Sequence, residues 1–371
     1  IRLYKAHFGE PKLASKKVVL ECINEAARKV ADHHFSQRFL VTEWDQFVDA
    51  WQLDTWEAYR DVMRLGRKTK LPKKQHEVLW SIFEHVREGL SKRGLITHSG
   101  LFSKLAAAMA KAKTPPFDFA VVDEAQDITP AHLRFFAALG GGRPNSLFFA
   151  GDLGQRIFQQ PFWKTLGVDV RGRSHSLTVN YRTSHQIRTQ SDRLLGAELS
   201  DVEGNVEDRS STVSVFNGPT PAIQILKTAK EEIEAVSKWI SERAKEGLVP
   251  REFGIFIRSI NELDRARAAA EAAAIPFKVL DENVETASNQ ASISTMHLAK
   301  GLEFRAVVVM ACDDEVIPSQ ERIETVADDA DLQEVYDTER HLLYVACTRA
   351  RDHLLVTGVE PASEFLDDLR T

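Results

Sequence analysis

The amino-acid sequence predicts an α/β fold built on mostly parallel sheet, preceded by a helical N-terminal third. From about residue 115 onward, short apolar runs that end in polar residues alternate with amphipathic helical stretches, a pattern typical of parallel α/β structure. Before that point, apolar residues recur at helical spacing, most clearly over residues 75–89. We therefore expect a helical subdomain over residues 1–112 and sheet-based structure over residues 113–172 and 173–371.

Strands are expected where continuous apolar runs are short enough to be single strands. Runs without polar alternation are typical of parallel strands that are covered on both faces. They lie at residues 119–122, 147–150, 177–179, 254–257, 276–280, 293–295, 306–311 and 354–357.

Helices are expected between these strands. Thr129 followed by Pro130 predicts a helix start, with the threonine as the N-cap and the proline in the first turn. Amphipathic stretches at 231–246, 261–274 and 339–350 predict further helices. The acidic stretch 313–337 is predicted to be a loop.

The composition excludes several classes of protein. No run of 18 apolar residues is present, so no membrane span is predicted. The three cysteines are far apart and predict neither disulfides nor a metal-ligand cluster, which fits a reducing, cytoplasmic compartment. The net charge of −6 gives no support for binding to phosphate backbones, so a nucleic-acid interaction must be predicted from local features. The chain begins with Ile1 rather than Met, which suggests a fragment or a processed chain.

An acidic segment follows the first predicted strand. Asp123 and Glu124 come directly after residues 119–122, and Ala-Gln-Asp completes the segment. A carboxylate at the end of a buried strand can hold Mg²⁺, and a second one beside it can activate a water for attack on a phosphoryl group. The alternative is an acidic turn that caps a helix. The strand before the pair and the Ala-Gln-Asp after it favour the catalytic role.

Two further polar segments follow the next predicted strands. Gln155 is a candidate to contact a phosphate or to position the water, and Phe158 and Trp163 are aromatic side chains of the kind that stack on bases. Tyr181 and Arg182 follow the third strand. There the tyrosine can stack on a purine, and the arginine can bind a terminal phosphate with two hydrogen bonds.

The last two polar segments lie near the C-terminus. Residues 295–304 contain Lys-Gly directly before a predicted strand, which supplies a turn and a charge. Residues 339–350 contain a Leu-Leu-Tyr-Val stretch that predicts a buried helix. Arg349 at the end of that helix is a candidate arginine finger, a side chain that neutralises transition-state charge.

These five segments, in this order, resemble motifs II to VI of the UvrD/Rep family of superfamily 1 helicases. The resemblance covers about residues 117–358, and the helical N-terminal third only by position. It implies two RecA-like domains with parallel sheets and ATP between them, the first domain incomplete and associated with an N-terminal helical subdomain. It also implies an ATP-dependent DNA helicase or translocase that moves 3′ to 5′ along single-stranded DNA.

The resemblance assigns roles to individual residues. Asp123 would hold Mg²⁺, and Glu124 would activate the attacking water. Contacts with the γ-phosphate would come from Gln155, Arg182 and Arg349. Contacts with the rest of ATP would come from Tyr181, Gly301 and Glu303. Single-stranded DNA or a tailed duplex would be contacted by Phe158, Trp163, Thr295 and His297.

The sequence departs from the family pattern in three places. No G-x-x-x-x-G-K-[ST] loop is present, so the lysine that neutralises the β- and γ-phosphates should lie upstream of residue 1, and this chain alone is expected to be nearly inactive. Gln160 stands where the family has a tryptophan, and Trp163 lies further along. Residues 183–294 are accounted for by the sheet's own strands and helices, so the helical domain that the family often inserts there is expected to be absent or reduced.

Two other functions remain open from the sequence. One is a helicase-derived module that senses a nucleotide or binds a partner without turnover. The missing loop favours it, and the intact Asp123, Glu124 and Arg349 oppose it. The other is the motor part of a helicase–nuclease or of a defence system. No nuclease-like cluster follows Arg349, so a protein partner would have to supply further domains.

Overall fold

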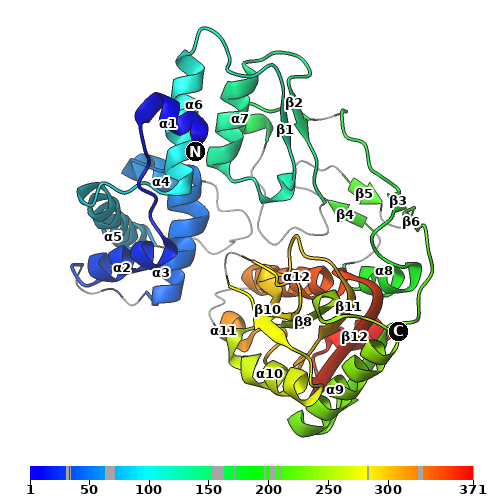
Figure 1. Ribbon diagram of the computed structural model, residues 1–371. Coiled ribbons are helices and arrows are strands. Elements are labelled where there is room, and N and C mark those ends of the chain that lie inside the picture. The colour runs from blue at the N-terminus through cyan, green and yellow to red at the C-terminus, as the bar shows by residue number, and fades with distance from the viewer. Residues whose placement is uncertain are drawn as a thin grey trace. The chain divides into compact units, whose positions relative to one another are not determined.

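The computed structural model describes residues 1–30, 33, 35–62, 72–152, 163–170, 172–195, 198–200, 206–208, 211–281, 284–324 and 329–370. Within these ranges the chain forms two compact units, whose helices and strands are drawn in Figure 1. The first unit contains the described residues up to Asp152 and from Trp163 to Ser174. The second contains those from His175 onward.

The N-terminal third is helical, as the sequence predicts. Hydroxyl side chains at the N-caps of four of its helices each accept a backbone N–H three residues further on. Apolar side chains of residues 18–90 pack into one core. The elements are α1 (Arg2–Phe8), α2 (Lys16–Ala27), α3 (Gln37–Glu43), the π-helical η1 (Trp44–Asp49), α4 (Trp56–Asp61), α5 (Lys73–Lys92) and α6 (His98–Lys111).

The first unit also contains a small parallel sheet. Strands β1 (Ala120–Val122) and β2 (Leu147–Phe149) pair in parallel and are connected through α7 (Pro130–Gly140). Thr129 caps α7 as predicted, since its hydroxyl accepts the His132 N–H at 3.4 Å. Helices α6 and α7 cover one face of the two strands.

The other face of β1 and β2 is exposed, so the prediction of strands covered on both faces is wrong here. Val121 and Phe148 are paired across the two strands and are 76% and 62% exposed. Phe119 is also exposed and lies on the same side, because side chains alternate between the faces of a strand. We call Phe119, Val121 and Phe148 the exposed sheet face. The prediction also fails at residues 177–179, where the strand starts at Val179 and Leu177 is exposed.

The second unit is built on a six-stranded, all-parallel sheet in the order β7-β12-β11-β8-β10-β9. Five of these strands lie at or next to predicted apolar runs, and the α/β fold class with parallel sheet is confirmed. The strands are β7 (Ala222–Leu226), β8 (Phe253–Ile257), β9 (Phe277–Val279), β10 (Ala291–Thr295), β11 (Phe304–Val309) and β12 (Ala350–Val359).

Helices cover both faces of this larger sheet. On one face lie α9 (Ala229–Lys245) and α10 (Leu263–Ala272). On the other lie α8 (His185–Asp192), α12 (Asp329–Cys347) and α13 (Phe365–Arg370). The predicted loop at 313–337 is partly wrong, because it contains α11 (Gln320–Ile323) and the start of α12. Acidic residues are favourable near a helix N-terminus, so an acidic stretch does not exclude a helix start.

Short elements complete the described structure. β3 (Val179–Asn180) pairs in parallel with β6 (Val213–Ser214), and β4 (Glu198–Ser200) pairs antiparallel with β5 (Val206–Asp208). The 3-10 turns are η2 (Ala125–Asp127), η4 (Lys164–Leu166), η5 (Pro250–Glu252), η6 (Ile260–Glu262) and η7 (Met296–Leu298). In the part of the chain that the structure describes, no helix has the length and apolar character needed to cross a membrane.

Candidate active site

The two predicted catalytic carboxylates lie at the edge of the small sheet in the first unit. Asp123 and Glu124 directly follow β1, and both are exposed. Gly151 and Asp152 follow β2 closely, and parallel strands end at the same edge, so these residues lie at that edge too. The backbone N–H of Glu124 donates to Asp123 Oδ1 at 2.8 Å. The carboxyl edge of the sheet therefore presents two adjacent carboxylates.

A buried amide joins these two strand ends. Gln126, in η2, donates from Nε2 to Glu124 Oε2 at 2.6 Å, and its Oε1 accepts the Asp152 N–H at 3.0 Å. The sequence alone predicts no role for Gln126. Its place between two acidic residues just after a strand is a weak signal, because the same pattern also fits an ordinary polar turn.

The carboxylates fit a Mg²⁺ ion that is completed by a nucleotide. In phosphoryl-transfer sites Mg²⁺ binds one or two carboxylates, and water and phosphate oxygens fill the rest of its shell. Asp123 and Glu124 supply two exposed carboxylates. No group of three or more His, Cys, Asp or Glu side chains among the described residues could hold a metal ion on its own. Two carboxylates therefore match a Mg²⁺ ion whose remaining ligands are water and the phosphate oxygens of a bound nucleotide.

In the second unit, predicted nucleotide-binding residues meet at the amino ends of the strands. Glu303 directly precedes β11, and Arg349 directly precedes β12. Arg182 donates from Nε to Glu303 Oε2 at 2.9 Å, and both side chains are partly exposed. Gly301 has a φ of 77°, a conformation that favours glycine, in the turn before Glu303. The fold thus joins Arg182 and Glu303 although they are 121 positions apart.

The turn that carries Arg182 is held by a single asparagine. Asn180 Oδ1 accepts the backbone N–H groups of Arg182 at 2.8 Å and Thr183 at 3.1 Å. Such bonding by an Asn side chain to the following backbone is a common way to fix a turn. Tyr181 projects from this turn and is 74% exposed. Its ring has the exposure that a stacking side chain requires.

Arg349, by contrast, is buried. Its side chain is 1% exposed. Nε donates to the Val345 carbonyl at 3.0 Å, and Nη1 to the Leu302 carbonyl at 3.5 Å. The Arg349 carbonyl in turn accepts the Phe304 N–H at 3.0 Å, so the residue lies against the segment that contains Glu303. A guanidinium held in this way must change conformation before it can contact a ligand.

The predicted DNA-contacting residues are dispersed. Thr295 ends β10 and is half-buried, and His297 lies in η7 and is exposed. Both are at the carboxyl end of the six-stranded sheet, opposite the end that carries Glu303. Trp163 in the first unit is buried, and its ring packs edge-on against Phe149 at 4.7 Å between centroids. This burial favours a packing role for Trp163. Gln155 and Phe158 lie outside the described residues.

A buried ion-pair network fixes the helix that leads to Arg349. Glu339, in the middle of α12, accepts from Arg258 Nε and Nη2 at 2.6 Å each and from Arg322 Nη1 at 2.8 Å. Burial raises the pKa of Glu339, but the hydrogen bonds and charges of Arg258 and then Arg322 outweigh it and hold the pKa below its usual value. Sequence reasoning missed this network, because nothing in residue spacing connects position 258 with position 339.

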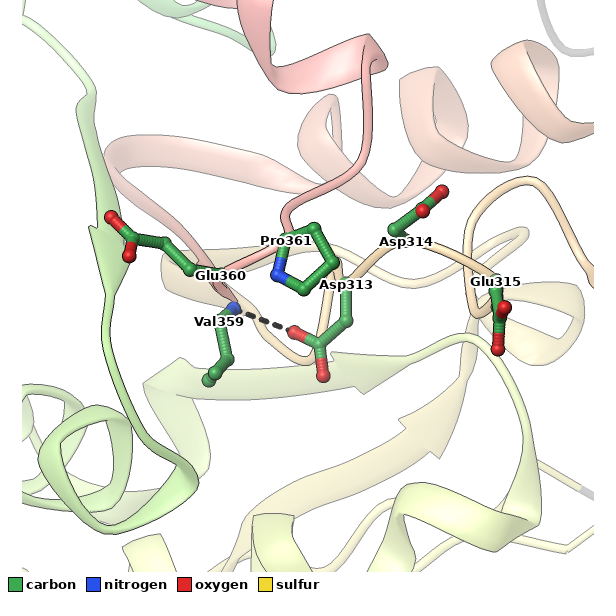
Figure 2. Close-up of a pocket in the computed structure, with 6 residues that line it drawn as sticks. All are labelled: Asp313, Asp314, Glu315, Val359, Glu360 and Pro361. Atoms are coloured by element: carbon green, nitrogen blue, oxygen red, sulfur yellow. Dashed lines mark hydrogen bonds between the residues drawn. The ribbon is translucent and has the colours of Figure 1, made fainter.

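A second acidic region lies beyond the ends of β11 and β12, and its contacts have a structural role. Figure 2 shows the pocket of about 280 Å³ there, lined by Asp313, Asp314, Glu315, Val359, Glu360 and Pro361. Asp313 accepts the Val359 N–H at 2.7 Å and a hydrogen bond from Arg265 at 2.5 Å. Arg265 also pairs with the buried Glu232. These contacts occupy Asp313 in holding the strand ends together, and we assign no ligand to this pocket.

Comparison with known proteins finds helicase relatives for part of the chain. Residues 281–360 match the UvrD-like helicase C-terminal domain. A putative ATP-dependent DNA helicase YjcD of Bacillus subtilis is 41% identical over 78 residues, 20% of this chain and 10% of that protein. DNA helicase II of Rickettsia typhi is 30% identical over 161 residues, 41% of this chain and 22% of that protein. The ATP-dependent DNA helicase PcrA of Staphylococcus aureus is 38% identical over 79 residues, 21% of this chain and 10% of that protein.

Residues 281–360 are thus similar to the C-terminal domain of UvrD-like helicases, and the matched relatives are DNA helicases. The matched part of this chain spans only 10% to 22% of the length of these relatives. Among solved structures, the C-terminal domain of a possible DNA helicase from Lactobacillus plantarum aligns with 51% of this chain and 94% of its own, at 21% identity and a TM-score of 0.36. The family match contains the last two polar segments, and with them Glu303 and Arg349.

Proposed function

We propose that this chain is the hydrolysis-triggering and DNA-contacting portion of an ATP-dependent translocase that moves 3′ to 5′ along single-stranded DNA. In this proposal residues 1–112 are a helical subdomain, 113–172 are part of a first RecA-like domain, and 173–371 form the second. The observation that carries it is the pairing of Arg182 with Glu303 next to Arg349, at positions of three helicase motifs that are far apart in sequence.

The chain's own residues suggest how hydrolysis would proceed. Glu124 would take the proton from the attacking water, and Asp123 would hold Mg²⁺, which neutralises phosphate charge when bound. Arg182 would exchange Glu303 for the γ-phosphate, and Glu303 would then be available to the ribose. Arg349 would leave the Leu302 carbonyl and add a second positive charge. Tyr181 would stack on the adenine.

A phosphate-binding loop is needed in addition to these residues. The 371-residue sequence contains no G-x-x-x-x-G-K-[ST] segment, so we propose that a segment outside it supplies the loop. The exposed sheet face supports this proposal, because parallel strands are normally covered on both faces. A strand that pairs in parallel with β1 or β2 would also end at the edge that carries Asp123.

The test is DNA-stimulated ATP hydrolysis by the full-length protein and by its Glu124→Gln variant. We expect hydrolysis that single-stranded DNA accelerates, and a fall of about 100-fold or more in the variant, as is typical when a general base is removed. Residues 1–371 alone should hydrolyse ATP at most very slowly. Absence of hydrolysis by the full-length protein, with and without single-stranded DNA, would rule out the motor.

The direction of movement needs its own assay. Strand displacement from duplexes with a 3′ tail or a 5′ tail separates the two polarities. We expect displacement from the 3′-tailed duplex. Displacement from 5′ tails only would overturn the proposed direction and leave the ATPase intact.

A nucleotide-binding module without turnover is the second candidate, and the burial of Arg349 favours it. Such a module would bind ATP, and Glu124→Gln would leave its behaviour unchanged. The ATPase comparison therefore separates the two candidates.

A further inference from the structure

The amide of Gln126 connects two strand ends that are 26 positions apart. The side chain is 3% exposed and makes one hydrogen bond in each direction. Nε2 donates to Glu124 Oε2 at 2.6 Å, and Oε1 accepts the backbone N–H of Asp152 at 3.0 Å. Reversing the amide would break both bonds. The amide nitrogen would then face the Asp152 N–H donor, and the amide oxygen would face the Glu124 carboxylate. The orientation of the Gln126 amide is therefore fixed.

The surroundings hold this amide tightly. Gly151 has no side chain, and a Cβ there would come within 2.6 Å of Gln126 Oε1. The Ala125 N–H donates to the Ala150 carbonyl at 2.8 Å, which ties the backbone next to Gln126 to the end of β2. Glu124 itself has a left-handed backbone, with φ 53° and ψ 41°, which is uncommon for a residue other than glycine. This conformation persists only where neighbouring contacts hold it.

We propose that Gln126 is a positioning residue that sets the Glu124 carboxylate for its role as general base and couples it to the Gly151–Asp152 turn. The inference rests on the proposed ATPase function. A carboxylate is planar, so fixing Oε2 by a hydrogen bond also restricts where Oε1 lies. General-base catalysis depends on that geometry, because the base must lie within hydrogen-bond reach of the proton that it takes.

The coupling follows from where Asp152 lies in the chain. Asp152 follows β2, at the sheet edge that also carries Glu124. A shift of the Asp152 backbone moves the N–H that Gln126 Oε1 accepts, and the same rigid amide then moves the donor to Glu124. Gln126 thus links the position of the Gly151–Asp152 turn to that of the Glu124 carboxylate.

Gln126→Met in the full-length protein tests the proposal. Methionine keeps the length and most of the volume of glutamine, and it can make neither hydrogen bond. We expect kcat for DNA-stimulated hydrolysis to fall about 10- to 100-fold, the range typical when the partner that orients a functional group is removed. The KM for ATP and the melting temperature should stay close to the wild-type values. Gln52→Met is the matched control, because Gln52 in the same unit also donates its amide to a neighbouring residue, Asp49, at 2.8 Å.

A double variant separates positioning from a general structural role. If Gln126 acts through Glu124, then Gln126→Met combined with Glu124→Gln should be no slower than Glu124→Gln alone, because the two effects are not additive. Gly151→Ala should behave like Gln126→Met, since its methyl group would displace the Gln126 amide.

The outcomes are distinct. A lowered kcat with unchanged KM, together with non-additivity, supports the proposal. Wild-type turnover in Gln126→Met, or a loss that adds fully to that of Glu124→Gln, overturns it while leaving the ATPase function in place. If the wild-type protein itself hydrolyses no ATP, the proposed function fails and this inference fails with it.

Discussion

At the residue scale, Arg182 and Glu303 form an ion pair with each other at 2.9 Å. Each is a candidate for a separate contact with ATP, and each side chain is partly exposed. An ion pair in such a setting contributes little to stability, because water screens it and two long side chains must be ordered. Exchanging this pair for contacts with a phosphate and a ribose is therefore easy. The pair therefore adds little to the stability of the fold, and its proposed role is in nucleotide binding.

Arg182→Ala should consequently impair activity without affecting stability. We expect kcat for ATP hydrolysis to fall about 100- to 1000-fold, as when a group that stabilises developing charge is lost. The melting temperature should change by less than about 2 °C, since surface substitutions have small effects. Arg60→Ala is the control, because Arg60 forms a similarly exposed pair with Asp61 in the first unit. Full activity of Arg182→Ala would show that Arg182 does not contact the nucleotide.

At the element scale, the position of α12 depends on Glu339. This carboxylate is buried between Arg258, which follows β8, and Arg322 of α11. Removing one member of a buried ion-pair network leaves uncompensated charge, which costs about 3–5 kcal/mol. The network lies in the middle of the helix whose end carries Arg349. It therefore fixes the element from which the candidate arginine finger must act.

Glu339→Gln should lower the free energy of unfolding by about 3–5 kcal/mol at neutral pH. Urea denaturation of residues 1–371 measures it. Glu88→Gln, which removes an exposed pair with Lys92 on α5, should leave the urea midpoint nearly unchanged. Equal midpoints for the wild type and Glu339→Gln would contradict the structural role of the network.

The stabilisation by Glu339 should also depend on pH. Its pKa in the folded chain is lowered by Arg258 and Arg322, so the folded state binds a proton less readily than the unfolded state does. The contribution is therefore fully present above about 4.5, the ordinary glutamate value, and is lost as the pH falls through the lowered pKa. Urea midpoints of wild type and Glu339→Gln should differ most at pH 7, and the difference should begin to shrink only as the pH falls below about 4.5. A difference that grows on acidification would show that the pKa is raised.

The positions of most helices and strands could be predicted from the sequence. The side chains that pair across the fold could not. Helical spacing placed α5 and α9, the Thr129–Pro130 pair placed the start of α7, and apolar runs placed most strands. These signals are local, whereas the Arg182–Glu303 and Arg258–Glu339 pairs depend on strand order in a parallel sheet. Apolar runs also do not report which face of a strand is covered. For that reason the exposure of Val121 was missed.

At the scale of the whole molecule, the exposed sheet face distinguishes the two units. The six-stranded sheet of the second unit has helices on both faces, whereas among the described residues helices cover one face of β1 and β2 and leave the other exposed. Contiguous exposed apolar side chains of this kind mark an interaction site or a tendency to aggregate. We propose that the part of the protein that carries the phosphate loop also covers these side chains. Substitutions at this face should therefore have different effects in residues 1–371 and in the full-length protein.

Replacing the exposed sheet face by Phe119→Ser, Val121→Thr and Phe148→Ser together tests that dependence. In residues 1–371 we expect higher solubility and an unfolding free energy within about 0.5 kcal/mol per substitution of wild type. In the full-length protein the same changes should destabilise, because the side chains would then be buried. Phe149→Ser, on the covered face next to Trp163, should destabilise both proteins. If the triple variant changed the unfolding free energy equally in residues 1–371 and in the full-length protein, this face would stay uncovered in the full-length protein.

The central claim is that these residues belong to a motor driven by ATP along single-stranded DNA. The most direct measurement is the ATP-dependent arrival of the full-length protein at a fluorophore on the 5′ end of single strands of increasing length. We predict an arrival time that grows linearly with strand length for the wild type, and no such growth for Glu124→Gln. An ATP-dependent signal that does not vary with strand length, or arrival at a 3′-end label instead, would contradict the account.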